Sequence, residues 1–300
     1  MGHVIWTQWD DLEVPANFKK LSPATTPADG GDFSQVTFYV PSYMGGRAAL
    51  ELTKQMPNLK ILQMPNAGYD DAMEFVRPGM TLCNGRSIHD DSTAELAVGL
   101  TIASLRGFPD FVRNQDKGKW VHTREKSIND RKIGVIGFGS IGSTVARMLS
   151  GFSVTVVPFT QSGRDNTTPI SELDKHLPTL DVIILILPLT KESKHLFDAR
   201  RLALMKDGSL LVNVARGPIV DTEALVKELN SGRITAALDV TDPEPLPEGH
   251  PLWSAKGVLI SPHVGGNTTA FEPRARRLIK SQLDLLAKGE ALNNIIVADN

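Results

Sequence analysis

Two side chains in the second half of the chain combine a reactive type with an unusual setting. Arg216 follows the apolar segment 210–214 and precedes Gly-Pro. A guanidinium presents a rigid fork of donors that can grip a carboxylate through two hydrogen bonds. His263 follows the apolar segment 258–260, with Pro before it and Val-Gly-Gly after it. Among the seven histidines it is the best placed for acid–base work, because these neighbours suit a loop better than a core.

Three acids, Asp239, Asp242 and Glu244, lie at the end of the largely apolar run 234–240 and in the Pro-rich segment that follows it. Solvated acids are the ordinary interpretation of such a loop. The pattern alone therefore leaves their roles open.

A glycine-rich turn supplies a second kind of chemistry. The apolar run 133–136 leads into the G-x-G-x-x-G pattern, and helical spacing of apolar residues follows it. Strand, glycine turn and helix together predict a dinucleotide site, in which the helix N-terminus faces the phosphates. The candidate contacts in this turn are Gly137, Phe138, Gly139, Ser140, Ile141 and Gly142.

The choice of dinucleotide depends on the end of the next strand, 154–157. An NAD site places an acid about 20 residues past the glycines, where it binds the ribose 2′-hydroxyl. Here that position is Pro158-Phe159, followed by Thr160, Ser162 and Arg164, which could bind a 2′-phosphate instead. We expect Asp165 to point away. NADP(H) is therefore the predicted preference, NAD(H) remains possible, and dual specificity with a solvated Arg164 is the alternative.

The elements that must position these residues alternate between strand and helix. In the first part we expect strands at 4–6, 36–40, 59–64 and 80–83 in a parallel sheet, a loop at 15–32, and helices at 45–56 and 92–106. The polar segment 107–131, with Trp120 among charges, is expected to be an excursion from the fold. In the second part we expect six strands, at 133–136, 154–157, 182–187, 210–214, 234–240 and 258–260, with helices at 221–230 and 268–288.

Bulk properties exclude several classes of function. A net charge of −2 without a basic block gives nucleic-acid binding no electrostatic support. One cysteine excludes an intrachain disulfide and fits a reducing compartment. Residues 1–10 do not resemble a signal peptide, and no apolar stretch approaches the roughly 20 residues of a membrane span. We expect a cytoplasmic protein with no membrane or nucleic-acid partner and no metal site.

The combination of these motifs resembles one enzyme family along the whole chain. Arg216, Glu244 and His263 resemble the catalytic set of the D-isomer-specific 2-hydroxyacid dehydrogenases, as does the separation of 47 residues between the first and the last. The segments Asn-Val-Ala-Arg-Gly, Leu-Asp-Val…Glu-Pro and Pro-His-Val-Gly are also similar to that family's. The loop at 160–164 is similar to that of NADP-preferring glyoxylate and hydroxypyruvate reductases.

The resemblance implies an α/β fold of two domains. A doubly wound, Rossmann-type dinucleotide-binding domain would occupy residues 93–271, and a smaller flavodoxin-like substrate domain would occupy 1–92, completed by 272–300. The excursion around Trp120 is similar to the family's dimerisation arm, whose tryptophan can reach a neighbour's active site. A homodimer is therefore expected.

The resemblance also implies roles. His263 would donate a proton to the keto oxygen, Glu244 would orient the imidazole and raise its pKa, and Arg216 would hold the substrate. Backbone N–H groups of Ala67, Gly68 and Tyr69 would bind the substrate carboxylate, with a plain turn as the alternative. Asp239 would contact the nicotinamide amide. Ligands bind after the carboxyl ends of strands, so further cofactor contacts are expected at Leu187, Pro188, Val214, Ala215, His263 and Gly265.

The expected reaction is reduction of a small 2-keto acid, such as glyoxylate or hydroxypyruvate, to the D-2-hydroxy acid. A formate dehydrogenase is disfavoured, because that branch carries Gln where Glu244 stands. Phosphoglycerate- and phosphite-type dehydrogenases share the three residues and stay open. So does a dinucleotide-sensing binding module without catalysis, although this chain keeps all three residues.

Overall fold

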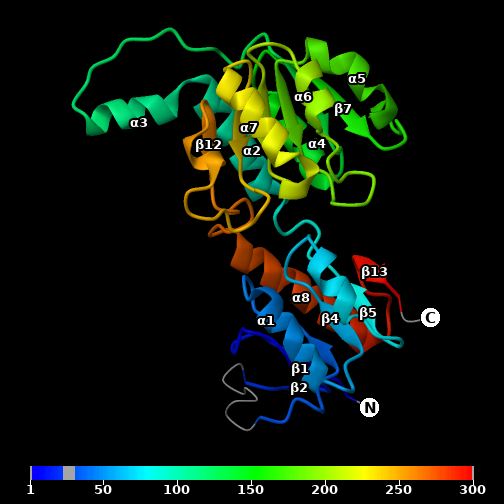
Figure 1. The fold of residues 1–300 in the computed structure, drawn as a ribbon. Helices are drawn as coiled ribbons and strands as arrows, with labels where there is room; N and C mark the ends of the chain where they lie inside the picture. The colour runs from blue at the N-terminus through cyan, green and yellow to red at the C-terminus, as the bar shows by residue number, and fades with distance from the viewer. Residues whose placement is uncertain (1, 23–30, 299–300) are drawn as a thin grey trace. The chain divides into compact units, whose positions relative to one another are not determined.

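The computed structural model describes residues 2–22 and 31–298, and the chain divides into two compact units (Figure 1). The smaller unit comprises Met1–His89 and Thr269–Asn300, and the larger unit comprises Asp90–Thr268. Each unit has its own sheet. The boundaries expected from the sequence, 92/93 and 271/272, each lie three residues further along the chain.

The larger unit is built on a seven-stranded sheet whose strands all run parallel. Its order, β12-β11-β10-β9-β6-β7-β8, contains the doubly wound order 3-2-1-4-5-6 with one further strand at the end. The strands are β6 (Lys132–Ile136), β7 (Thr155–Thr160), β8 (Thr168–Pro169), β9 (Val182–Leu185), β10 (Leu210–Asn213), β11 (Thr235–Leu238) and β12 (Val258–Ile260). The strand order reverses between β6 and β9, and a ligand is expected at their carboxyl ends.

Helices cover both faces of this sheet, which explains its continuously apolar strands. Successive residues of β9 alternate between two cores: Val182 and Ile184 pack on one face, and Ile183 and Leu185 on the other. Helices of the larger unit are α2 (Asp90–Leu105), α3 (Phe108–Asp116), α4 (Ser140–Leu149), α5 (Leu173–His176), α6 (Ala199–Leu204) and α7 (Thr222–Ser231). Its 3-10 helices are η4 (Ile170–Glu172), η5 (Leu177–Thr179), η6 (Gly217–Ile219) and η7 (Pro251–Ser254).

The smaller unit has a six-stranded sheet with the order β13-β5-β4-β3-β1-β2. Its first five strands follow the flavodoxin-like order 2-1-3-4-5 and run parallel. The strands are β1 (Val4–Trp6), β2 (Lys19–Lys20), β3 (Phe38–Tyr39), β4 (Ile61–Gln63), β5 (Thr81–Cys83) and β13 (Ile295–Val297). Helix α8 (Phe271–Lys288) packs Phe271, Ala275, Ile279 and Leu283 into the core, and α1 (Gly46–Glu51), η2 (Leu52–Gln55) and η3 (Asp70–Phe75) complete the unit.

Several sequence expectations need correction. The small sheet is not wholly parallel, because β13 pairs antiparallel with β5. The expected loop 15–32 contains the short strand β2, and its residues 23–30 lie outside the described part. The larger sheet has a seventh strand, β8, and β7 continues three residues beyond the expected end, to Thr160. Segments this short depend on pairing partners rather than on their own pattern.

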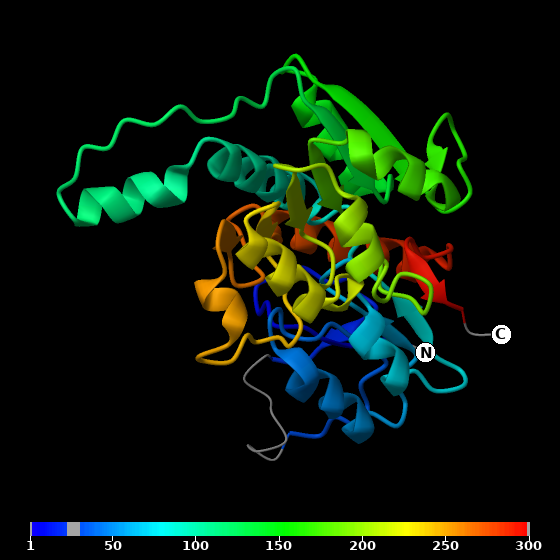
Figure 2. The same cartoon turned by 45° about the horizontal axis from the view of Figure 1, so that its top comes forward.

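The excursion at 107–131 contains a helix that the sequence reading did not place. Helix α3 has no buried residue, and the segment after it has no regular structure up to β6. Both views show α3 and this segment projecting away from the sheet of the larger unit (Figures 1 and 2). No helix among residues 2–22 and 31–298 is long and apolar enough to cross a membrane.

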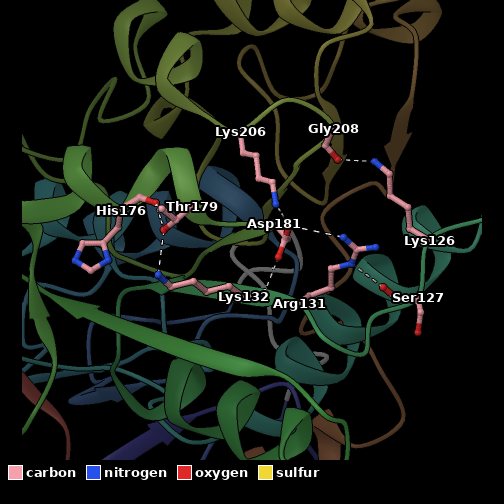
Figure 3. A network of polar contacts seen from close by, with 9 residues as sticks. All are labelled: Lys126, Ser127, Arg131, Lys132, His176, Thr179, Asp181, Lys206 and Gly208. Carbon is pink, nitrogen blue, oxygen red and sulfur yellow. Dashed lines mark hydrogen bonds and ion pairs between the residues drawn. The ribbon is translucent and has the colours of Figure 1, made fainter.

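A polar network fastens the amino ends of β6, β9 and β10, opposite the expected ligand edge (Figure 3). The Asp181 carboxylate, at the start of β9, accepts from the backbone N–H of Lys132 at 2.9 Å and from Lys206 Nζ at 2.7 Å, and lies 3.7 Å from Arg131 Nη1. Burial opposes ionisation of Asp181, but these donors outweigh it and hold its pKa below the ordinary value.

We predict that Asp181→Asn lowers the free energy of unfolding by roughly 1–3 kcal/mol near neutral pH, because a charged acceptor is lost. A carboxyl whose pKa is lowered by folding stabilises the protein above its unfolded pKa, and this contribution is lost as the pH falls through the folded pKa. The difference from wild type, measured by urea unfolding, should therefore shrink towards about pH 3.

Asp207→Asn is the matched control, because its side chain is 85% exposed although it also pairs with an arginine. It should change stability by less than about 0.5 kcal/mol. An equal loss for Asp181→Asn at both ends of the pH range would contradict the role given to its charge.

Candidate active site

The glycine turn after β6 packs too tightly for side chains at its first and last glycine. A Cβ on Gly137 would lie 2.3 Å from the carbonyl oxygen of Ile186, and one on Gly142 would lie 2.2 Å from that of Gly137. Gly137 also has a φ of +100°, which favours glycine. A Cβ on Gly139, the N-cap of α4, would meet nothing within 4 Å. The middle glycine thus leaves open space beside a helix N-terminus, as a bound pyrophosphate requires.

A cavity of about 610 Å³ in the larger unit begins at this turn. Six of the expected cofactor contacts line it: Gly137, Phe138, Thr160, Arg164, Leu187 and Pro188. The rest of the wall consists of residues not named as cofactor contacts, although Gln161 and Thr190 lie in segments expected at the ligand edge: Gln161, Ile170, Thr190, Glu192, Ser193 and Leu196. Most of these follow β9 or start the short helix after β8, so only their position after a strand could have indicated them. Ser162 is exposed and does not line the cavity.

The segment after β7 is ordered by its own threonines. The Thr160 hydroxyl accepts from the Gly163 N–H at 3.1 Å and lies 2.6 Å from the Thr167 hydroxyl. Arg164 is left with its side chain 70% exposed at the cavity wall. The Asp165 carboxylate lies 3.9 Å from Arg164 Nε, but Asp165 does not line the cavity, so the expectation that it points away from the phosphate stays a prediction. The chain turns through positive φ at Asp165 and Asn166, which brings this carboxylate back beside the guanidinium.

The residues around the cavity fit a nicotinamide dinucleotide. An open glycine stands at a helix N-terminus, apolar side chains from the segment after β9 line the cavity, and no acid follows β7 directly. Ser140, Ile141 and Gly142 form the first turn of α4 beside this cavity's glycines. Val214 and Ala215 are buried directly after β10, the neighbour of β9.

Arg216 is positioned by a braced turn after β10. Buried Asn213 accepts from the Ala215 N–H at 3.0 Å and donates to the Arg216 carbonyl at 3.0 Å. The next residue, Gly217, has no room for a side chain, since a Cβ would lie 1.9 Å from the Thr241 carbonyl oxygen. This close approach holds the Arg216 turn against the segment that leads to Glu244.

His263 sits in a loop held by Asp239. The His263 N–H donates to the Asp239 carbonyl at 2.8 Å, and the Asp239 carboxylate accepts from the N–H groups of Val264 and Gly265, each at 2.9 Å. Ser261 Oγ donates to the same carboxylate at 2.6 Å. These bonds hold His263 at a φ of +53°, an uncommon value for a residue with a side chain. Asp239 is thus a buried brace, and its expected nicotinamide contact stays a prediction.

The imidazole of His263 and the carboxylate of Glu244 lie in direct contact, with Nδ1 and Oε1 2.5 Å apart. This hydrogen bond is the main cause that raises the pKa of His263, against burial and the charge of Arg216, which lower it. Burial of Glu244 acts to raise its pKa, but the His263 contact and the Arg216 charge outweigh it and lower the pKa. Arg216 therefore lies near enough to act on both groups, and the larger unit brings all three side chains together.

Ala67, Gly68 and Tyr69 follow β4 in the smaller unit and are half-buried. They lie where a parallel sheet presents a ligand site, at the carboxyl end of a strand. No group of three or more His, Cys, Asp or Glu side chains in the described part of the chain is arranged to hold a metal ion.

Comparison with known proteins agrees with this arrangement. Residues 98–265 match the family described as D-isomer specific 2-hydroxyacid dehydrogenase, NAD binding domain. A glyoxylate reductase of Thermofilum pendens is 35% identical over 255 residues, which cover 80% of this chain and 75% of that protein. A D-3-phosphoglycerate dehydrogenase of Methanocaldococcus jannaschii is 29% identical over 270 residues, 85% of this chain and 51% of that protein.

A solved structure shares the fold over nearly the whole chain. It is an NADPH-dependent glyoxylate/hydroxypyruvate reductase from Sinorhizobium meliloti in complex with NADP and sulfate, with a TM-score of 0.83 and 20% identity over 99% of this chain and 98% of that one. The chain belongs to the D-isomer specific 2-hydroxyacid dehydrogenase family, and its two-domain α/β fold is that of the family.

We predict that Glu244→Gln lowers the pKa of His263 by roughly one unit or more, because the imidazolium loses its negatively charged acceptor. The measurement is an NMR titration of the His263 ring, which needs no turnover. Glu248→Gln is the control, since it removes an exposed acid four residues after Glu244 that does not bond the imidazole. Equal titration of His263 in the wild type and Glu244→Gln would contradict the pairing.

Proposed function

We propose that this protein reduces a small 2-keto acid of the glyoxylate or hydroxypyruvate type to the D-2-hydroxy acid, with NADP(H) as the preferred cofactor. The observation that carries the proposal is the 2.5 Å contact between His263 Nδ1 and Glu244 Oε1, beside a charge from Arg216 that acts on both. Reduction of a 2-keto acid needs a proton donor, such as a protonated imidazole, beside a cationic group that binds the carboxylate of the substrate.

His263 is the general acid in this proposal. Glu244 occupies Nδ1, so the other ring nitrogen, Nε2, is the one that donates a proton to the keto oxygen. The Glu244 contact raises the pKa of His263 and so favours the protonated imidazole. A bound nicotinamide would supply the hydride. In this proposal His263 supplies the proton, Glu244 favours the protonated form of the imidazole, and Arg216 holds the substrate.

Arg216 and the loop Ala67-Gly68-Tyr69 bind the substrate in this proposal. The guanidinium fork suits the carboxylate and the keto oxygen of a 2-keto acid. Backbone N–H groups of the loop suit a substrate carboxylate. We assign the substrate-binding role to residues 1–92 with 272–300, and the dinucleotide-binding role to 93–271.

The cofactor preference rests on the segment after β7. No acid follows β7 directly, and Arg164 lies on the cavity wall with an exposed side chain. Thr160 shapes this segment through its bonds to Gly163 and Thr167, while exposed Ser162 offers a hydroxyl. The remaining cofactor contacts that we propose are Gly137 to Gly142, Leu187, Pro188, Val214, Ala215, Asp239, His263 and Gly265.

A second copy of the chain is the proposed partner. Helix α3 and the segment after it expose Phe108, Phe111, Val112, Trp120 and Val121, and Trp120 is 99% exposed. Apolar side chains gathered on one projecting arm favour contact with another chain. We propose a homodimer formed through this arm.

A phosphoglycerate-type reaction is the second candidate. It is favoured by the Methanocaldococcus jannaschii relative, although the chain spans only about half of that protein. The glyoxylate reductase of Thermofilum pendens is more similar and is covered over three quarters of its length, which favours the smaller substrate.

The experiment is a panel of 2-keto acids, including glyoxylate, hydroxypyruvate and 3-phosphohydroxypyruvate, each with NADPH and NADH. We expect the highest kcat/KM with one of the first two, and we expect His263→Ala to lose at least about 100-fold in kcat. A maximum with the phosphorylated acid would favour the second candidate. Tight cofactor binding without turnover on any acid would favour a binding module instead.

We predict that Arg164→Ala raises the KM for NADPH about tenfold or more and leaves that for NADH within about twofold, since only NADPH has a 2′-phosphate. The measurement is initial-rate kinetics with each cofactor at saturating keto acid.

Asp165→Asn is the matched control. It removes the carboxylate beside Arg164 and keeps the guanidinium, so the KM for NADPH should stay constant or fall. Equal effects of Arg164→Ala on both cofactors would refute the assignment of Arg164 to the 2′-phosphate.

A further inference from the structure

The loop 66–69 of the smaller unit is held through three successive carbonyl groups. The Asn66 carbonyl accepts from the Gly85 N–H at 2.7 Å. The Ala67 carbonyl accepts from Asn84 Nδ2 at 2.8 Å, and the Gly68 carbonyl accepts from Asn66 Nδ2 at 2.9 Å. Two of these donors belong to Asn84 and Gly85, directly after β5, which is the sheet neighbour of β4 (Figure 1).

This pattern fixes which way the N–H groups of the loop point. In a trans peptide the C=O and the following N–H point in opposite directions. Carbonyls of residues 66, 67 and 68 bonded to protein donors therefore turn the N–H groups of Ala67, Gly68 and Tyr69 away from those donors. Within residues 2–22 and 31–298 no hydrogen bond uses these three N–H groups, and the residues are half-buried. Successive N–H groups presented in this way form a site for an anion.

Asn84 is itself immobilised by a buried polar network. Its Oδ1 accepts from the Arg86 N–H at 3.2 Å, and its own N–H donates to the Asn294 carbonyl at 3.0 Å. Its carbonyl accepts from Gln63 Nε2 at 3.1 Å, and Gln63 Oε1 accepts from Gln282 of α8 at 2.7 Å. Gln63 and Gln282 are fully buried. These backbone bonds fix the main chain of Asn84, and rotation of its amide would break both side-chain hydrogen bonds, to the Ala67 carbonyl and from the Arg86 N–H.

Gly85 adds a steric condition. A Cβ at this position would lie 2.8 Å from the backbone nitrogen of Asn66 and 2.8 Å from the carbonyl carbon of Pro65. The backbone after β5 therefore packs directly on the start of the loop. Any side chain at 85 would displace the loop rather than a flexible neighbour.

We propose that Asn84 and Gly85 are positioning residues that orient the N–H groups of Ala67, Gly68 and Tyr69 towards the substrate carboxylate. Neither residue needs to touch the substrate. The inference rests on the proposed function, because it takes this loop as the carboxylate site.

The test compares Asn84→Ala with Tyr39→Phe. Tyr39 is fully buried in the same unit, and its hydroxyl donates to the Ala49 carbonyl of α1 at 2.6 Å, not to a group of the loop 66–69. Tyr39→Phe removes this hydrogen bond to a backbone carbonyl, and Asn84→Ala removes the one to the Ala67 carbonyl together with the one from the Arg86 N–H. The readouts are the Kd of oxalate for the NADPH-loaded enzyme, the KM and kcat for glyoxylate, the Kd of NADPH, and Tm.

We expect Asn84→Ala to raise the Kd of oxalate and the KM for glyoxylate about tenfold, while the Kd of NADPH stays within about twofold. Tyr39→Phe should lower Tm but change neither carboxylate constant by more than about twofold. Asn84→Asp keeps the shape of the side chain and replaces the donor with an acceptor, so it should raise both constants at least as much. Gly85→Ala should also raise the Kd of oxalate and the KM for glyoxylate, because the added Cβ would displace the loop.

The proposal is overturned if Asn84→Ala and Asn84→Asp leave both constants within twofold, or if Tyr39→Phe raises them as much. Should Asn84→Ala fail to fold, Asn84→Asp and Gly85→Ala decide by the same criteria. Failure of the wild type to reduce any 2-keto acid or to bind oxalate is a separate result, which would overturn the proposed function and this inference together.

Discussion

The hydrogen bond between His263 and Glu244 is the interaction on which the candidate chemistry depends. It requires two loops from different strands to hold a ring nitrogen and a carboxylate oxygen 2.5 Å apart. The Asp239 carboxylate fixes the histidine loop through three donors. On the other side, the absence of a side chain at Gly217 lets the Arg216 turn lie against the backbone at Thr241. The hydrogen bonds to the buried Asp239 carboxylate and the close backbone packing at Gly217 thus set the geometry of the exposed His263–Glu244 pair.

Both units use the carboxyl ends of parallel strands in the same way. In the larger unit, the glycine turn, the Arg216 turn and the His263 loop follow β6, β10 and β12. In the smaller unit, the loop 66–69 and the segment 84–85 follow the adjacent strands β4 and β5. Parallel pairing places neighbouring strand ends at one edge, so residues far apart in the sequence become neighbours there.

The sequence predicted the elements that carry their own pattern. The strand at 133–136, the glycine turn and α4 could be placed because apolar spacing and glycine positions are local properties. The strand 4–6 and the strand 258–260 have the expected bounds. The end of β9 could not be read, because Ile186 and Leu187 continue its apolar run past the last paired residue, Leu185.

Features that depend on distant partners were beyond the sequence. Strand β13 exists only through its pairing with β5, and β8 through its pairing with β7. The position of Asp165 follows from two residues with positive φ, which no pattern indicated. The fit of Asn84 to the Ala67 carbonyl and the bracing role of Asp239 need atomic positions across two loops. Residue types could indicate a candidate acid and an anchor, but not the groups that hold them.

The most direct test of the central claim is the pH dependence of kcat/KM in both directions of the reaction. If His263 is the proton source, reduction needs the imidazolium and should fall as the pH rises through the raised pKa of His263, whereas oxidation should fall as the pH drops through that same pKa. A kcat/KM for reduction that does not change across this pH range would contradict the account. So would a kcat/KM that changes in the same direction with pH for both reduction and oxidation.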